Sequence, residues 1–381
     1  MHNISTTLTP TPLTDFNITN PSSTCHLHKD SRLENVIKIV LYIVAMVVSL
    51  GGNTLLIYAV KQRKRMHTVT NFLIINMAAA DLFITVFNMP TYLEILITQK
   101  YDWMGGPLGV LLCKLVLFIQ GVSVTCSVLT LTVLSVHRFV SVFFPWKKLM
   151  NTKNVKFAIA GIWIASFLFI SPLLYALNVM EHNRMLVCDE RWSPLFDEKQ
   201  APKNYTIVLF VLLYMAPLLI MAVLYSCLIY KLWFRCPSEL PASSYRRQSE
   251  EALSVSRVSS DDKSKHAKSK KLVLKMLVTV VVVFALCWLP MHVRSFFVFF
   301  SKDGLPCLPS FLEFIGYFLG HANSALNPCI YVSFSESYRH TFKTVLFKLC
   351  GKKKVKTPVK RPKRDVEVEL QKKRLNYKYH L

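Results

Sequence analysis

The sequence predicts an all-α membrane protein, a seven-transmembrane helix bundle with a short amphipathic eighth helix. Of its 381 residues, 52% are hydrophobic, and the mean hydropathy of +0.35 is typical of a membrane protein and not of a soluble domain. Seven apolar segments are each long enough to cross a hydrocarbon core of about 30 Å as a helix. They cover approximately residues 35–60, 69–97, 110–143, 155–178, 204–233, 271–300 and 309–333.

The placement of charge predicts the orientation of these segments. The net charge is +24, and Lys and Arg gather at 61–66, at 147–156, between the fifth and sixth segments, and after the seventh. Loops on the opposite side are mixed or acidic. Positively charged loops favour the cytoplasm, so we expect a plasma-membrane protein with an extracellular N-terminus and a cytoplasmic C-terminus. Because the basic residues lie at segment ends, they favour membrane lipids as partners and not nucleic acid.

Composition divides the chain into three parts. Residues 1–34 are rich in Thr, Ser, Pro and Asn and are expected to form an extracellular glycosylated arm. Residues 35–350 form the membrane domain, which includes a polar cytoplasmic loop at 236–270 and an amphipathic helix at 334–350. Residues 351–381 form a basic cytoplasmic tail.

Cysteines and glycosylation sequons agree with this orientation. Cys113 begins the third segment and Cys188 follows the fourth, where a disulfide would hold the loop over the mouth of the bundle. Cys25 and Cys307 are candidates for a second outer bridge, and Cys350 is a candidate palmitoylation site at the end of the amphipathic helix. The three sequons all fall on the predicted outer side, at Asn3, Asn17 and Asn204.

The third segment carries polar or reactive residues at regular intervals. These are Cys113, Gln120, Ser127 and Arg138, separated by steps of seven, seven and eleven residues. At about 100° per residue they lie within roughly 40° of one helix face. An arginine that faced lipid would be unfavourable, so this face should point into the bundle. We therefore predict that this helix connects an outer site with an inner one.

Other segments carry polar groups and prolines at membrane depth. Asp81 in the second segment is either a functional carboxylate or a protonated acid that is hydrogen-bonded to a neighbouring helix. Pro217, Pro290 and Pro328 lie within the fifth, sixth and seventh segments, where they allow the helices to bend. Bendable helices suit a conformational switch better than a rigid scaffold.

Taken together, these features resemble the rhodopsin-like, or class A, G-protein-coupled receptors over approximately residues 35–350. Each matching motif lies on its own segment and in order: Gly52-Asn53, the AAAD that ends at Asp81, Cys113 with Cys188, Arg138, Trp163, Pro217, CWLP at 287–290 and NPxxY at 327–331. Within the family, FIQGVSV around Gln120, CDERW at 188–192 and NSALNP are similar to neuropeptide receptors of the neuropeptide FF, RFamide and orexin group.

The resemblance implies the partners of the chain. We expect an extracellular neuropeptide ligand, a heterotrimeric G protein, arrestin and receptor kinases, with no cofactor other than an allosteric sodium ion. Class A receptors for amines or lipids are the alternative. Amine receptors carry an Asp where Gln120 stands, and opsins carry a lysine where His321 stands. A transporter should show internal repeats and an enzyme a catalytic or metal signature, and the sequence has neither.

Position in the segments and the resemblance together assign site residues. The outer pocket is expected to contain Gln120, Glu94, Asp189, Glu190, His292, Arg294, Glu313, Tyr317 and His321. Acids predominate in this set, which favours a cationic peptide end such as a C-terminal Arg-Phe-amide. The resemblance implies a packing switch at Trp288, Phe284, Pro217 and Val128, a sodium site at Asp81, Ser127, Asn323 and Asn327, and G-protein coupling through Arg138, Tyr225 and Tyr331.

One departure from the family concerns the residues beside Arg138. The family has Asp/Glu-Arg-Tyr, whereas this sequence has His137-Arg138-Phe139. Lys270 stands where some members place a glutamate. The acids that restrain the arginine in the resting state are therefore missing. We predict raised basal signalling, with pH sensitivity added by His137.

Overall fold

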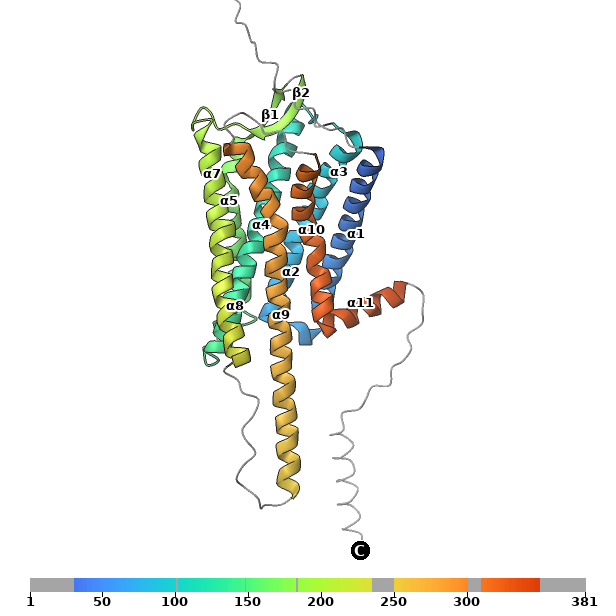
Figure 1. The fold of residues 1–381 in the computed structure, drawn as a ribbon, viewed down its shortest axis with the longest axis vertical. Coiled ribbons are helices and arrows are strands. Elements are labelled where there is room, and N and C mark those ends of the chain that lie inside the picture. Colours follow the sequence, from blue (N-terminus) through green and yellow to red (C-terminus); the bar gives the residue numbers. More distant parts are fainter. Residues whose placement is uncertain are drawn as a thin grey trace, which may run out of the picture.

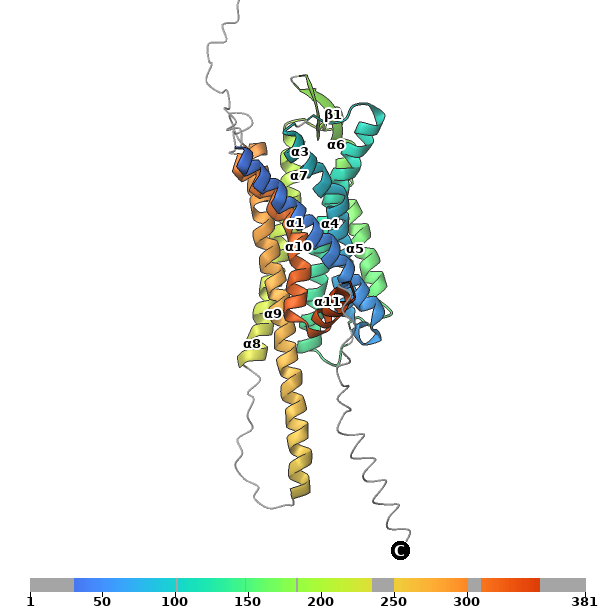
Figure 2. The same ribbon diagram turned by 90° about the vertical axis from the view of Figure 1, so that its right-hand side faces the viewer.

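The computed structural model describes residues 31–100, 102–147, 149–182, 184–234, 250–300 and 310–349. Long helices run side by side along one axis (Figure 1). A β hairpin covers one end of the bundle, here called the hairpin end, and α11 lies across the axis at the other, the α11 end (Figures 1 and 2). The predicted all-α architecture is confirmed, with this hairpin as an addition.

Seven rods correspond to the seven apolar segments. They are α1 (Arg32–Gln62); α2 (Val69–Phe83) with the π-helical η2 (Ile84–Asn88) and α3 (Met89–Thr98); α4 (Gly106–Phe143); α5 (Val155–Ile170) with α6 (Pro172–Ala176); α7 (Gln200–Phe210) with the π-helical η3 (Val211–Met215) and α8 (Ala216–Phe234); α9 (Glu250–Phe300); and α10 (Ser310–Phe334). A 3₁₀ turn, η1 (Lys64–Met66), follows α1, and α11 (Glu336–Leu349) follows α10.

Membrane-spanning character is strongest in six of these rods. Within the described residues, all but α10 contain a helix long and apolar enough to cross a membrane by length and composition. The seventh rod carries polar side chains inside the bundle, among them His321, Asn323 and Asn327, and these reduce its hydropathy. The hydropathy of α10 is therefore low because this helix supplies many polar side chains to the interior of the bundle.

Two differences from the sequence-based boundaries are informative. Helix α1 begins three residues before 35, because Ser31 and Glu34 form a capping box in which each side chain accepts a backbone N–H of the other. The loop predicted at 236–270 is wrong for residues 250–270, which are the first part of α9 and project beyond the bundle (Figures 1 and 2). Residues 250–270 contain no Pro or Gly that would end a helix. The helix was not recognised in the sequence because it has no apolar stripe.

Prolines and glycines determine local geometry in the bundle. The two π-helical turns, η2 and η3, end two residues before Pro90 and Pro217, which cannot donate the usual backbone hydrogen bond. The sequence predicted bending at Pro217, and at both sites the chain accommodates the proline with a widened turn. A Cβ at Gly52 would lie 2.6 Å from Pro328 Cγ, so only glycine permits this approach of α1 to α10.

Helix α4 is central to the packing. It contacts α2, α5, α8 and strand β1 (Leu177–His182), which pairs antiparallel with β2 (Met185–Glu190). The cluster of buried side chains toward the α11 end includes Leu73, Leu131 and Leu277. A smaller one toward the hairpin end includes Tyr42 and Phe314.

Candidate functional site

A buried polar network joins three rods in the middle of the bundle. Asp81 on α2 is 1% exposed and accepts hydrogen bonds from Ser324 Oγ and Asn327 Nδ2 on α10, each at 2.9 Å. Asn53 Nδ2 on α1 donates to the backbone oxygens of Ser49 and Ser324, each at 3.0 Å. The carboxylate of Asp81 therefore holds α10 against α2, while Asn53 ties α1 to the same turn.

The predicted sodium ligands carry oxygen atoms that are not used in this network. Among the described residues, Ser127 Oγ, Asn323 Oδ1 and Asn327 Oδ1 are buried without a hydrogen-bond partner. Helix α4, which carries Ser127, packs against α2. Carboxylate, hydroxyl and amide oxygens are the donors that a hard cation prefers, so the residues fit a sodium ion. Ser324 was missed as a partner of Asp81 by sequence reasoning, although it lies within the NSALNP motif.

An aromatic layer lies between this network and the hairpin end. Val128, Phe284 and Trp288 are buried in one cluster, and the rings of Phe284 and Trp288 are 6.2 Å apart between centroids. Pro217 is buried on α8. The Trp288 ring packs on α10, where a Cβ at Gly320 would lie 3.3 Å from it. The Trp288 ring therefore forms part of the contact between α9 and α10.

At the α11 end, Arg138 has no acidic partner in the part of the chain that the structure describes. Its Nε is buried and unpaired, as is Nδ1 of the adjacent His137. Tyr225 lies near both Arg138 and Tyr331, and accepts a hydrogen bond of 2.7 Å from Ser135 Oγ. The residues predicted to contact the G protein thus share one region of the bundle.

The hairpin is fastened to the bundle by the predicted disulfide. Cys113 on α4 is bonded to Cys188 on β2, 75 residues later, which confirms that prediction. Asp189 beside it is exposed and lies on the same side of the mouth as Tyr317 on α10. Glu190 is half-buried and accepts a hydrogen bond of 2.8 Å from Trp192 Nε1. Burial raises the pKa of Glu190, and Asp189 adds to this rise while the Trp192 bond opposes it. Glu190 therefore holds Trp192 in place, whereas Asp189 remains accessible.

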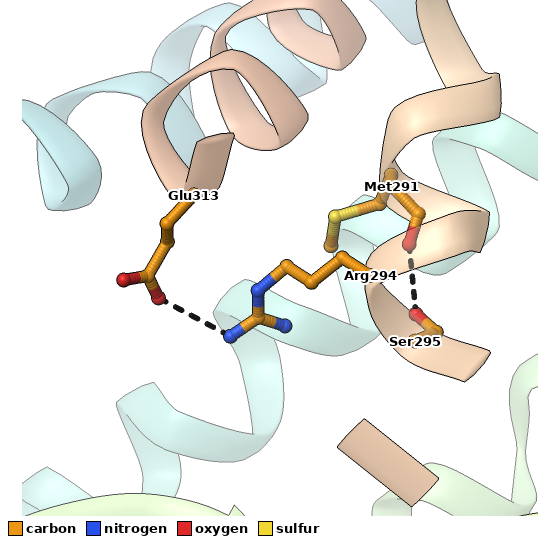
Figure 3. A network of polar contacts seen from close by, with 4 residues as sticks. All are labelled: Met291, Arg294, Ser295 and Glu313. Atoms are coloured by element: carbon orange, nitrogen blue, oxygen red, sulfur yellow. Dashed lines mark hydrogen bonds and ion pairs between the residues drawn. The ribbon is translucent and has the colours of Figure 1, made fainter. Parts of the chain in front are cut away.

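Two predicted pocket residues form an ion pair across the mouth. Arg294 Nη2 on α9 lies 3.3 Å from Glu313 Oε1 on α10, and the two side chains extend toward each other (Figure 3). The Arg294 guanidinium also lies over the Tyr317 ring, 4.9 Å from its centroid. The acidic predominance expected here is thus reduced, because Glu313 is already neutralised by a neighbour.

Below this pair, aromatic rings extend from α10 to α1. The Tyr92 ring lies 4.8 Å from Tyr317 and 5.0 Å from Tyr42, between centroids. A hydrogen bond of 2.6 Å joins the Tyr42 hydroxyl and His321 Nδ1, and His321 Nε2 is buried without a partner within the described ranges. Sequence reasoning missed Tyr42 and Tyr92, because nothing in an apolar segment marks which tyrosine faces the interior.

The remaining pocket residues differ in accessibility. His292 packs against the Phe210 and Tyr214 rings, 5.3 Å and 4.4 Å away, in the mouth between α7 and α9. The side chains of Gln120, half-buried, and Glu94, exposed, make no hydrogen bond with any residue that the structure describes. Both are therefore available to a ligand.

The comparison with known families decides the identity. Residues 52–331 match the model of the 7 transmembrane receptor (rhodopsin family), which spans all seven rods including α10. The chain belongs to this family. It is a class A G-protein-coupled receptor and not an enzyme, as the motifs in the sequence indicated. The seven rods are therefore transmembrane.

The receptor has close relatives among neuropeptide receptors. It is 31% identical over 332 residues to neuropeptide FF receptor 2 of Mus musculus, covering 82% of this chain and 72% of that receptor. It is 33% identical over 313 residues to neuropeptide FF receptor 1 of Rattus norvegicus, covering 79% and 68%. It is 31% identical over 306 residues to the pyroglutamylated RF-amide peptide receptor of Mus musculus, covering 77% and 66%. The neuropeptide-receptor resemblance is thereby confirmed.

Several predicted sites lie outside the described residues. These are the sequons at Asn3 and Asn17, the candidate bridge between Cys25 and Cys307, and Cys350. The third sequon residue, Asn204, is exposed on α7 and accepts a hydrogen bond of 2.9 Å from Gln200 Nε2. Glycosylation at these asparagines and palmitoylation at Cys350 stay predictions.

Loss of the disulfide should separate the hairpin from the mouth of the receptor. Cys188→Ser is expected to reduce ligand binding at least tenfold, because a native disulfide typically contributes about 2–5 kcal/mol. Binding to receptor at the cell surface measures this, with Cys329→Ser as the matched control, since Cys329 is a free, exposed cysteine. Unchanged binding by Cys188→Ser would show that the hairpin does not shape the site.

Proposed function

We propose that the receptor binds an extracellular, cationic, C-terminally amidated peptide such as an RFamide at the hairpin end. The observation that carries this proposal is the pairing of accessible carboxylates with aromatic rings at the mouth. Glu94 and Asp189 are exposed, and Tyr317, Tyr92 and Tyr42 form a continuous ring layer below them. A guanidinium suits the carboxylates, and an aromatic side chain suits the rings.

The relatives support the same ligand class, since their names refer to neuropeptide FF and to an RF-amide peptide. The half-buried amide of Gln120 on α4 has a free donor and a free acceptor, so it suits a peptide amide. An amine or a lipid would leave either the carboxylates or the amide of Gln120 unused. These remain the alternative ligand classes.

The orientation that this function needs places the hairpin end and the arm at 1–34 outside the plasma membrane. The α11 end, the loop at 236–249 and the tail at 351–381 then face the cytoplasm, together with the projecting part of α9. The basic residues of these stretches would contact lipid headgroups, G protein, arrestin and receptor kinases. Helix α11 would lie on the inner leaflet.

Signal transmission would use the layers described above. Ligand binding at the mouth would move the Trp288 ring, and with it α9 relative to α10. A sodium ion held by Asp81, Ser127, Asn323 and Asn327 would neutralise the carboxylate and favour the resting arrangement. Opening at the α11 end would expose Arg138, Tyr225 and Tyr331 to a G-protein helix. Such coupling requires only that the ligand bind the active state more tightly than the resting state by a few kcal/mol.

A second-messenger assay on cells that express the full chain tests the ligand class. Amidated peptides are screened first, followed by amines and then lipids. A response to amidated peptides alone supports the proposal. A response to an amine or a lipid, without one to any peptide, would replace the proposed ligand class.

Reversing the acidic charge at the mouth should weaken activation. Glu94→Lys, Asp189→Lys and Glu313→Lys are each expected to raise the half-maximal concentration of a cationic amidated peptide about tenfold or more, because each replaces an attraction by a repulsion. Dose–response curves measure this, with Glu181→Lys on the exposed side of β1 as the matched control. If none of the three differs from the control, the electrostatic account is wrong.

A further inference from the structure

Arg294 places a cation in a mouth that otherwise suits a cationic ligand. Its guanidinium crosses from α9 to Glu313 on α10 and lies over the Tyr317 ring (Figure 3). Glu313 is thus bound by a group of the same chemistry as the arginine of the proposed peptide. Any ligand guanidinium that reaches Glu313 must replace one that belongs to the receptor.

The ion pair is built loosely. It consists of one N–O contact of 3.3 Å, which is longer than the roughly 2.7–2.9 Å of strong charge-assisted hydrogen bonds. Both side chains are 24% exposed, so solvent reaches the pair. Arg294 Nε is buried and has no hydrogen-bond partner in the described part of the receptor. The ion pair therefore leaves hydrogen-bonding capacity unused on both the guanidinium of Arg294 and the carboxylate of Glu313.

The surroundings allow Arg294 to leave. Gly316 on α10 faces its aliphatic stem, and even a Cβ there would stay 3.9 Å from Arg294 Cδ. The stem can therefore slide along α10 while the charged head moves toward solvent. Glu313, in contrast, lies in the first turn of α10, and its shorter side chain would stay at the mouth.

We propose that Arg294 is a specificity-determining residue that competes with the ligand for Glu313. This inference rests on the proposed function. A ligand arginine binds Glu313 through two parallel N–H···O bonds and displaces the single N–O contact between Arg294 and Glu313. A ligand lysine, which lacks the planar fork, cannot form that pair of bonds and leaves Arg294 in place. The exchange therefore selects arginine over lysine at this position of the peptide.

The two partners of the pair should respond to mutation in opposite directions. Arg294→Gln removes the competitor and is expected to raise the affinity for an arginine-containing peptide about threefold or more. Glu313→Gln removes the shared partner and is expected to lower that affinity about tenfold. If the pair were only structural, each single substitution would leave one charge unpaired, and both would lower the affinity.

Competition binding on membranes that contain the full chain tests the exchange. The probes are a synthetic amidated peptide ending in Arg-Phe-NH2 and its analogues with lysine or uncharged citrulline in place of the arginine. We expect the parent receptor to prefer the arginine form. Arg294→Gln should bind the arginine and lysine forms more tightly and narrow the difference between them, without changing the affinity for the citrulline form. Glu313→Gln should lose most of the preference for a charged residue.

Arg191→Gln is the matched control, since Arg191 is an exposed arginine after β2 at the same end of the receptor. If Arg191→Gln raises the affinity as much as Arg294→Gln does, the effect of Arg294 is general charge repulsion, and the proposed exchange is wrong. If Arg294→Gln and Glu313→Gln both weaken binding, the exchange is overturned while the proposed function stands. If the parent receptor does not bind the amidated peptide at all, the proposed ligand class and the exchange are both wrong.

Discussion

Replacing Asp81 with asparagine is expected to remove the sodium dependence of ligand affinity and to reduce ligand-stimulated signalling severalfold. In the receptor, each carboxylate oxygen of Asp81 accepts one hydrogen bond from α10, from Ser324 Oγ or Asn327 Nδ2. An asparagine has the same shape but offers one acceptor. The second donor would then face an NH2 group, and an unpaired buried donor costs about 1–3 kcal/mol. The substitution also removes the charge that would attract a cation.

Ligand binding measured in sodium buffer and in N-methyl-D-glucamine buffer separates these effects. The parent receptor is expected to bind agonist several times more weakly in sodium, whereas Asp81→Asn should bind equally in both. Glu181→Gln serves as the control, because Glu181 is an exposed carboxylate on β1. A sodium effect that survives in Asp81→Asn would exclude Asp81 as a ligand of the ion.

Introducing an acid beside Arg138 is expected to lower agonist-free signalling about fivefold. His137→Asp would supply the carboxylate that family members carry at this position. Arg138 Nε is buried without a partner among the described residues, so the new carboxylate would meet an unsatisfied cation. If the new ion pair stabilises the resting state by about 1–3 kcal/mol, the equilibrium between resting and active receptor shifts about 5- to 150-fold toward the resting state.

Basal second-messenger levels at matched surface expression measure this effect. His137→Asn is the control, since it has the size of aspartate without its charge. If His137→Asp signals as strongly as the parent without agonist, the missing acid does not explain basal activity. If His137→Asn lowers the signal equally, the cause is the loss of the imidazole and not the gain of a carboxylate.

Features that depend on short-range pattern were predictable from the sequence. The seven rods follow from the length of the apolar segments, and the Cys113–Cys188 bridge follows from the outer position of both cysteines together with the family resemblance. Asp81 and Asn327 were assigned to one polar site, and a hydrogen bond of 2.9 Å joins them. These features are robust because burying a charge or an unpaired polar group in lipid is unfavourable in any arrangement of the helices.

Features that depend on side-chain partners were not predictable. The sequence placed Glu313 and Arg294 in one pocket but could not show that each neutralises the other. It treated Glu190 as a ligand contact, whereas its partner is Trp192 two residues away. It also took residues 250–270 as a loop, because a helix that projects from the bundle needs no apolar stripe.

By itself, the amino-acid sequence determined that this protein crosses a membrane seven times and that its polar residues face a shared interior. The reason is that lipid does not solvate backbone or charged groups, so apolar length and polar spacing leave few alternatives. Only the tertiary structure decided which of those polar residues are bound to one another and which are open to a ligand. That choice depends on the distances between side chains on different helices, such as the 3.3 Å between Arg294 and Glu313, and no pattern along one helix encodes these distances.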